Sequence, residues 1–136
     1  MPDSTKTRQL ATHWSGMWTG SSWGGVSSQH HPRSNTHQGA APDFHSWTAP
    51  WSMNIVNQDG RHVEVLYKTD NYESRLVGVI TADFSKMILT GEVAIYHFEI
   101  DVAAGTMWGQ WSARPHGTDK VGANFACGEV EISAVL

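Results

Sequence analysis

Short, evenly spaced runs of alternating apolar and polar residues are the feature that most constrains this chain. From Trp51 onward these runs recur about every ten residues, separated by turn signals and without any long stretch of helical periodicity. Such a run suits a strand with one buried face, because successive side chains of a strand point to opposite sides. The sequence therefore predicts an all-β protein.

The predicted strands are joined mostly by short turns. The clearest turn is Gln58-Asp59-Gly60, since Asp-Gly suits the backbone of a tight hairpin. The predicted strands are His13–Gly20, Trp51–Asn57, Arg61–Thr69, Glu73–Thr81, Met87–Val102 (as one bent strand or two), Thr106–Ala113 and Gly128–Val135. Short links favour a meander, so we predict an antiparallel up-and-down barrel of about eight strands.

The chain of 136 residues has the length of one domain, and we predict a single barrel over residues 1–136. Residues 1–11 are polar and are predicted to be a flexible lead-in. Residues 21–50 are rich in Ser, Gly, His and Pro and are predicted to form a long His-rich loop. Phe44, Trp47 and Trp51, near the end of this segment, indicate that its second half packs onto the barrel.

The first strand places Trp14, Gly16, Trp18 and Gly20 on one face, where glycine lets a ring or a neighbouring backbone come close. Its Gly16-Met17-Trp18 resembles the Gly-x-Trp of calycin-type barrels, the group of lipocalins, fatty-acid-binding proteins and avidins. The resemblance implies that Trp18 seals the barrel floor with a late basic residue, here Arg114, against its ring. It also implies a pocket for a small apolar or aromatic molecule.

The count of seven tryptophans is high for a chain of this size. A barrel of about eight strands can be filled by side chains or can hold one small ligand. We predict a ligand cavity, with Trp51, Tyr67 and Trp111 at its mouth and Tyr96 deeper. The predicted ligand-binding residues are Trp18, Trp51, Met53, Tyr67, Phe98, Trp108 and Trp111. The expected partner is a small hydrophobic or aromatic molecule.

Candidate catalytic residues lie in one alternating run. In Tyr96–Asp101, an inward polar face would make His97 and Glu99 a proton-transfer pair. Tyr96, on the opposite face of the run, is a separate candidate as a hydrogen-bond donor. An outward polar face is the favoured alternative. Without a hydrolase motif, any reaction is expected to be a cyclisation or isomerisation that depends on holding the substrate. The apolar neighbours of Cys127 predict a buried, inert thiol.

Several classes of partner are not expected. The net charge is −4 and the basic residues are scattered, so we expect no nucleic-acid partner. No apolar run reaches the roughly 20 residues of a membrane-spanning helix, so no membrane is expected. One cysteine and a polar start predict a cytoplasmic protein. No cofactor motif is present and no cofactor is predicted. A homodimer is compatible with the sequence.

Two further classes of function stay open. The segment Trp18–Gly25 is typical of a carbohydrate-binding module or lectin if its tryptophans are exposed. The loop histidines His30, His31, His37 and His45 could bind a metal. Because none of the histidines has the spacing of a known metal motif, we predict no metal site.

Overall fold

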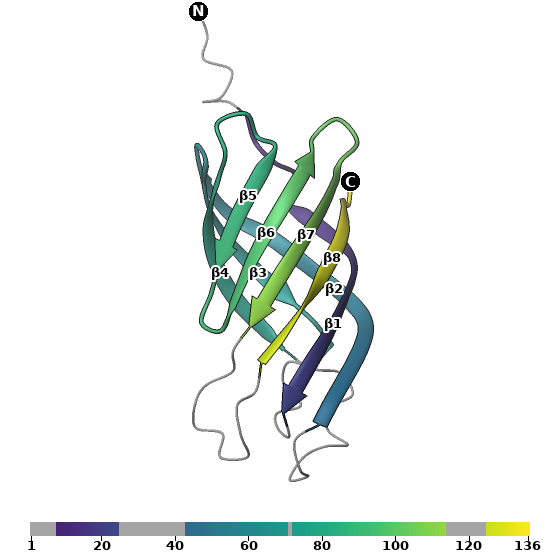
Figure 1. The fold of residues 1–136 in the computed structure, drawn as a ribbon. Coiled ribbons are helices and arrows are strands. Elements are labelled where there is room, and N and C mark those ends of the chain that lie inside the picture. Colours follow the sequence, from purple (N-terminus) through teal and green to yellow (C-terminus); the bar gives the residue numbers. More distant parts are fainter. Residues whose placement is uncertain (1–7, 25–42, 71, 114–124) are drawn as a thin grey trace, which may run out of the picture.

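The computed structural model is a closed barrel of eight antiparallel strands, and it describes residues 8–24, 43–70, 72–113 and 125–136 (Figure 1). The strands are β1 (His13–Gly24), β2 (Asp43–Asp59), β3 (His62–Lys68), β4 (Glu73–Ile80), β5 (Lys86–Thr90), β6 (Ala94–Asp101), β7 (Thr106–Ala113) and β8 (Phe125–Ala134). Each strand pairs with the next, and β8 closes onto β1. The predicted all-β up-and-down barrel is confirmed. No helix in the described residues is long and apolar enough to cross a membrane.

The first hairpin is longer than predicted. β1 and β2 pair in one unbroken register from His13↔Asn54 to Gly24↔Asp43. The prediction of a loop over residues 21–50 is therefore wrong at both ends, where backbone pairing continues the strands; residues 25–42 lie outside the described part. The run Met87–Val102 is two strands, β5 and β6, and β8 begins before Gly128.

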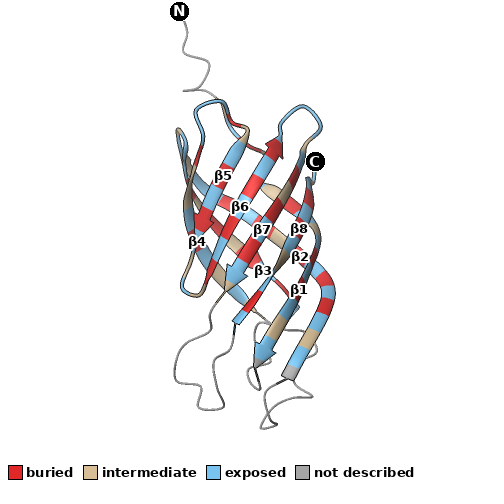
Figure 2. Ribbon diagram, in the orientation of Figure 1, coloured by how far each residue is buried: buried red, intermediate tan, exposed pale blue. Residues whose placement is uncertain are grey.

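Burial alternates along the strands, with buried residues alternating with exposed ones (Figure 2). β6 shows this most regularly. Ala94, Tyr96, Phe98 and Ile100 are buried, and the residues between them are exposed. This confirms the outward orientation that was favoured for the polar face of β6.

A plug of side chains fills the barrel end at which the β4–β5 turn and the N-terminal segment meet. Phe84, from the turn, is 0% exposed, and the Arg8 guanidinium lies 4.7 Å from its ring centroid. Leu10 is buried in the core, and the Gln58 side chain bonds both the Leu10 N–H and the Arg8 carbonyl. Residues 8–11 are thus packed against the barrel, and the predicted flexibility of residues 1–11 is wrong for this part.

The turn that carries Phe84 is built around one carboxylate. Asp83 accepts hydrogen bonds from the Thr81 hydroxyl at 2.8 Å, the Ser85 hydroxyl at 2.7 Å and the Ser85 backbone N–H at 3.0 Å. Phe84 itself has a φ of 59°, a left-handed conformation that is uncommon for a bulky residue. The polar turn therefore holds the backbone in the shape that directs an apolar ring inward.

We expect Phe84→Ala to lower the free energy of unfolding by about 3–5 kcal/mol, because it empties a buried site. Chemical denaturation followed by circular dichroism would measure this. Phe125→Ala is the matched control, since that ring is 46% exposed, and its effect should stay within about 0.5 kcal/mol. Equal effects of the two substitutions would contradict the plug.

The pH dependence of stability should report the Asp83 turn. Hydrogen bonds from Ser85 and Thr81 lower the pKa of Asp83 from 3.8 to about 2. A lowered carboxyl pKa stabilises the folded state above the unfolded-state value, and this stabilisation disappears as the pH falls through the folded-state value. Between pH 3.8 and about 2, Asp83→Asn should therefore lose less stability than the wild type. Parallel acid-unfolding curves for the two proteins would contradict this role.

Candidate functional site

Seven aromatic rings form one buried cluster that fills much of the barrel interior. The rings come from five strands: Trp18, Trp47, Trp51, Tyr67, Tyr96, Phe98 and Trp111. Tyr96 lies among Trp51, Tyr67 and Trp111, with ring-centroid distances of 5.5, 5.8 and 6.4 Å. Trp18 contacts Trp47 at 5.3 Å and Trp111 at 5.0 Å. Trp51, Tyr67 and Trp111 therefore surround Tyr96 in the interior, but Trp51 is only 1% exposed, so this packing does not show the predicted cavity mouth.

Two inward-facing glycines make room for these rings. A Cβ at Gly20 would lie 2.6 Å from a Trp47 ring atom and 2.7 Å from a Trp111 ring atom, and one at Gly109 would lie 2.6 Å from the Phe98 ring. Large rings therefore occupy the space that glycines leave on neighbouring strands of the wall. This is how a closely packed core is filled.

The free space inside is much smaller than the predicted ligand cavity. Beside the rings lies a cavity of about 20 Å³, enough for a single water molecule. Its lining is uncharged and consists of Trp18, Tyr67, Thr69, Tyr72, Val93, Ala94, Tyr96, Trp111, Ala113 and Ala126. The prediction of a cavity that encloses a whole ligand is wrong for the described residues, because the rings themselves occupy the interior. The cavity lies toward the barrel end opposite the Phe84 plug.

One indole of the cavity lining, that of Trp18, has a buried N–H without an acceptor among the described residues. The Trp18 side chain is 4% exposed, and its indole Nε1 has no hydrogen-bond partner among the described residues. By contrast, the Trp111 Nε1 donates to the Thr19 carbonyl at 3.3 Å, and the Trp14 Nε1 donates to the Ala11 carbonyl at 2.7 Å. A buried N–H without an acceptor is costly, so an acceptor that reached the Trp18 Nε1 would be stabilised.

The tyrosine hydroxyls of the site are held in their neutral form. Burial raises the pKa of Tyr67 above its usual range, and the nearby Tyr96 and Tyr72 raise it further. Burial also raises the pKa of Tyr96, although hydrogen bonding to its oxygen by Trp51 and Tyr67 acts in the opposite direction. The Trp51 Nε1 lies close enough for this effect but lacks the geometry of a full hydrogen bond. At neutral pH both hydroxyls are therefore donors and poor bases.

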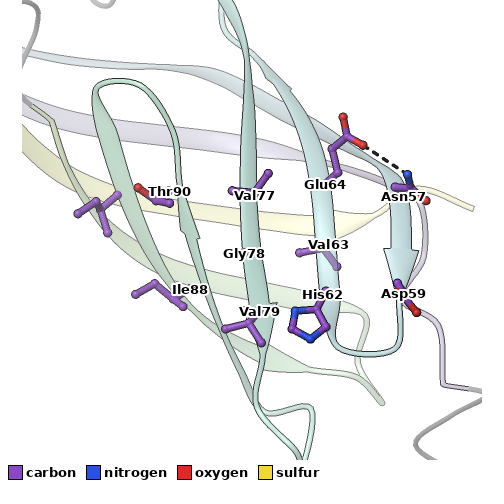
Figure 3. Close-up of a pocket in the computed structure, with 11 residues that line it drawn as sticks. Asn57, Asp59, His62, Val63, Glu64, Val77, Gly78, Val79, Ile88 and Thr90 are labelled. Atoms are coloured by element: carbon purple, nitrogen blue, oxygen red, sulfur yellow. Dashed lines mark hydrogen bonds between the residues drawn. The ribbon is translucent and has the colours of Figure 1, made fainter.

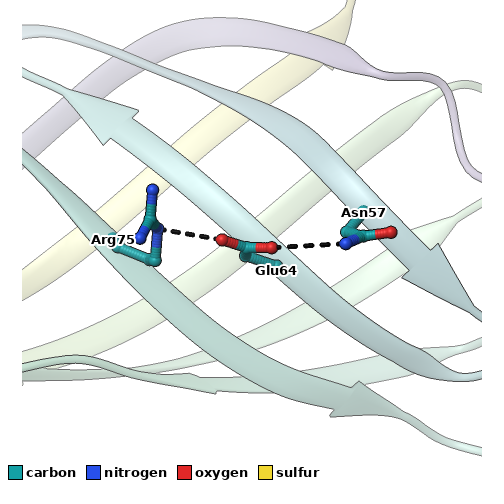
Figure 4. A network of polar contacts seen from close by, with 3 residues as sticks. All are labelled: Asn57, Glu64 and Arg75. Carbon is teal, nitrogen blue, oxygen red and sulfur yellow. Dashed lines mark hydrogen bonds and ion pairs between the residues drawn. The ribbon is translucent and has the colours of Figure 1, made fainter.

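A larger hollow, of about 770 Å³, lies on the outer wall over β3, β4 and β5 (Figure 3). Val77, Ile88 and Ile95 line it with exposed side chains. At one side, Glu64 pairs with Arg75 at 2.9 Å and accepts a 3.4 Å hydrogen bond from Asn57 (Figure 4). A ligand here would stay largely in water, whereas binding sites usually bury most of their ligand. We therefore place the candidate site at the ring-lined cavity.

Several predicted site residues lie elsewhere. His97 and Glu99 are exposed on the outer wall, so they do not reach the interior as a proton-transfer pair would. Trp108 is also on the outer wall, because its neighbours Met107 and Gly109 are the inward residues of β7. The remaining predicted residues, Trp18, Trp51, Met53, Tyr67, Tyr96, Phe98 and Trp111, are buried inside.

Trp18 does not seal the barrel floor as the calycin resemblance implied. It lines the cavity at the ring-filled end, whereas Phe84 and Leu10 fill the plugged end. Arg114, its expected partner, lies outside the described residues. The predicted burial of Cys127 is wrong as well, since it alternates with the inward Ala126 and Gly128 and its side chain is exposed.

Tyr72 is the one aromatic residue of the described cavity lining that the sequence did not predict. It follows the β3–β4 turn and is partly buried, with its ring 6.0 Å from that of Tyr67. Its place after Asp70-Asn71 made it look like part of the turn. Trp47 also joins the cluster, as its expected packing on the barrel suggested, but Phe44 is 67% exposed.

A metal site finds no support in the described residues, which contain no group of three or more His, Cys, Asp or Glu side chains able to hold an ion. His45 is the one loop histidine that is described, and it stacks near Trp47 with ring centroids 6.5 Å apart. His30, His31 and His37 lie outside the described residues.

The fold and the site together define a closed eight-stranded antiparallel barrel with an aromatic core, which is consistent with a calycin-like barrel. No protein-family model, curated protein or solved structure matches the chain. The function is therefore argued from the geometry of the site.

Substituting Gly20 should test the packing of the ring cluster. Gly20→Ala places a methyl group against Trp47 and Trp111, and we expect it to lower the free energy of unfolding by about 1–3 kcal/mol. Ser21→Ala, at the next, exposed position, is the control and should change it by less than about 0.5 kcal/mol. An unchanged stability for Gly20→Ala, measured by denaturant unfolding, would show that the rings are loosely packed.

Proposed function

We propose that this barrel binds a small, neutral, aromatic or apolar molecule that carries a hydrogen-bond acceptor, at the ring-lined end of the barrel. The buried Trp18 Nε1 without an acceptor is the observation that carries the proposal. The cavity beside it has room for one oxygen-sized group, so the acceptor enters the cavity and the rest of the ligand lies over its rim. Tyr72, Val93 and Ala113, each partly buried, form that rim.

The chemistry of the lining selects the charge of the ligand. Among the residues that the structure describes, no charged side chain lines the cavity, and Glu92 lies near enough to Tyr67 to raise its pKa further. An anion would therefore enter without a countercharge and close to a carboxylate. A ketone, amide or ether oxygen needs only a donor, which the Trp18 indole supplies. Stacking on the surrounding rings adds affinity.

A cyclisation or isomerisation at this site would have to use the tyrosines. His97 and Glu99 are excluded from the cavity by their place on the outer wall. Because the Tyr67 hydroxyl donates to the Tyr96 oxygen, the neutral Tyr96 hydroxyl is the donor that would polarise a substrate oxygen rather than abstract a proton. Binding is therefore the primary proposal, and catalysis an extension of it.

A matched pair of fluorescent or absorbing probes tests the proposal. Of 2-acetylnaphthalene and 2-ethylnaphthalene, which differ mainly in the carbonyl oxygen, the ketone should bind about fivefold more tightly, as one net hydrogen bond implies. Trp18→Phe keeps a ring but removes the N–H and should abolish this difference. Trp23→Phe, on an indole that is 46% exposed on the outer wall, should preserve it.

Two results would contradict the proposal. One is equal affinity of the wild type for the two probes. The other is a preference for the ketone that survives in Trp18→Phe. A loss of the preference in Trp23→Phe alone would instead support the exposed aromatic surface that a carbohydrate-binding module requires.

A further inference from the structure

The longest strand of the barrel has no partner along half of one edge. β2 runs from Asp43 to Asp59, but β3 pairs with it only from Ser52 onward. Between Asp43 and Trp51, β2 pairs with β1 alone among the described residues. In Figure 1 this part of β1 and β2 extends past the end of the neighbouring strands. The barrel therefore carries an open strand edge, although its wall is closed.

The register shows which backbone groups this edge presents. The Ile55 N–H donates to the Thr12 carbonyl at 2.7 Å, so the odd-numbered residues of β2 direct their N–H and C=O toward β1. The direction of the backbone N–H and C=O groups alternates from residue to residue along an antiparallel strand. Phe44, Ser46 and Thr48 therefore direct their N–H and C=O groups away from β1. Pro50 has no N–H to present, so the donors of the open edge end at Thr48.

Between Asp43 and Pro50, this edge lacks the devices that usually protect one. Edge strands are commonly guarded by charged side chains, bulges or prolines. The segment from Phe44 to Ala49 contains no Lys, Arg, Asp or Glu, and its pairing with β1 has no bulge. Pro50 interrupts the edge only at the end nearest the paired part of β2, which begins at Ser52. Two identical copies of this segment could therefore approach without like-charge repulsion.

Exposed rings gather beside the same edge. Phe44, Trp23 and Phe125 are neighbours in the register across β2, β1 and β8, and all three point outward. Their exposed fractions are 67%, 46% and 46%. The ring next to the edge, Phe44, is the most exposed of the three. Apolar surface clustered in this way is typical of an interaction site.

We propose that two copies of this chain associate through antiparallel pairing of their β2 edges, centred on Ser46. A two-fold axis through Ser46 places Phe44 opposite Thr48 of the second copy. The free N–H and C=O groups of these residues in one copy can then hydrogen-bond to those of the other copy. The two sheets then continue as one, and the aromatic rows of both copies lie on the same face. Each Phe44 ring packs beside the small side chains of the opposite strand.

Amide hydrogen exchange by NMR at two protein concentrations tests the edge directly. If the edges pair, the amides of Phe44, Ser46 and Thr48 exchange rapidly in dilute protein and become protected as the concentration rises. The amides of His45, Trp47 and Ala49 face β1 and stay protected at both concentrations. Edge amides that are protected even in a dilute monomer would show that the chain covers its own edge, and the proposal would fail.

Sedimentation from micromolar to submillimolar concentration tests the assembly with a matched pair of variants. Ser46 and Ser21 are cross-strand neighbours, both exposed on the outer face, but only Ser46 lies on the edge strand. Ser46→Lys places two like charges opposite each other and should weaken self-association about fivefold, whereas Ser21→Lys should leave it nearly unchanged. Circular dichroism would establish that both variants fold.

Three results of the sedimentation and exchange experiments would overturn the proposal. They are a wild-type monomer throughout the range, equal effects of the two lysines, and a dimer whose edge amides stay unprotected. A monomer that gains edge protection only from an added extended peptide would assign the edge to a different partner. None of these results depends on the ring-lined cavity, so they leave the proposed ligand site unaffected.

Discussion

Packing of large rings against inward-facing glycines is the constraint on which the rest of this structure depends. Gly20 leaves the space that Trp47 and Trp111 occupy, and Gly109 leaves the space for Phe98. The closed wall fixes the interior volume, so each ring that enters removes room for anything else. This is why a barrel of ordinary dimensions has a cavity of only about 20 Å³ beside its aromatic cluster, and why a ligand can meet the rings only at one end.

The two ends of the barrel consequently differ in chemistry. At the plugged end, the polar groups of the Asp83 turn and of Gln58 find partners, and Phe84 and Leu10 fill the space between the strands. At the ring-lined end, the Trp18 indole stays without an acceptor among the described residues. A folded chain rarely leaves a buried donor unsatisfied without reason. The asymmetry therefore supports the proposed ligand site at the end where a buried donor is left without an acceptor.

Alternation in the sequence was enough to predict the barrel and most of its inward residues. Tyr96 and Phe98 could be placed on one face by parity, and the structure shows them buried. The same alternation excludes Trp108 from the barrel interior, because Met107 and Gly109 hold the inward positions on either side of it. Alternation could not predict that Phe84 enters the core, since this depends on a positive φ within a polar turn. Nor could it predict whether the rings would line a cavity or fill it, because that depends on how facing strands interdigitate.

Strand length explains why a closed barrel still has an open edge. β2 has 17 residues and β1 has 12, whereas β3 has seven and β4 has eight. A strand can pair with its neighbour only as far as the shorter of the two extends, so the surplus of β2 must project beyond β3. The surplus contains Trp47, which is needed inside the ring cluster, and Phe44, which is not. The part of β2 that extends beyond β3 thus places Trp47 in the core. The same extension leaves the outward backbone groups of Ser46 and Thr48 without a partner on β3.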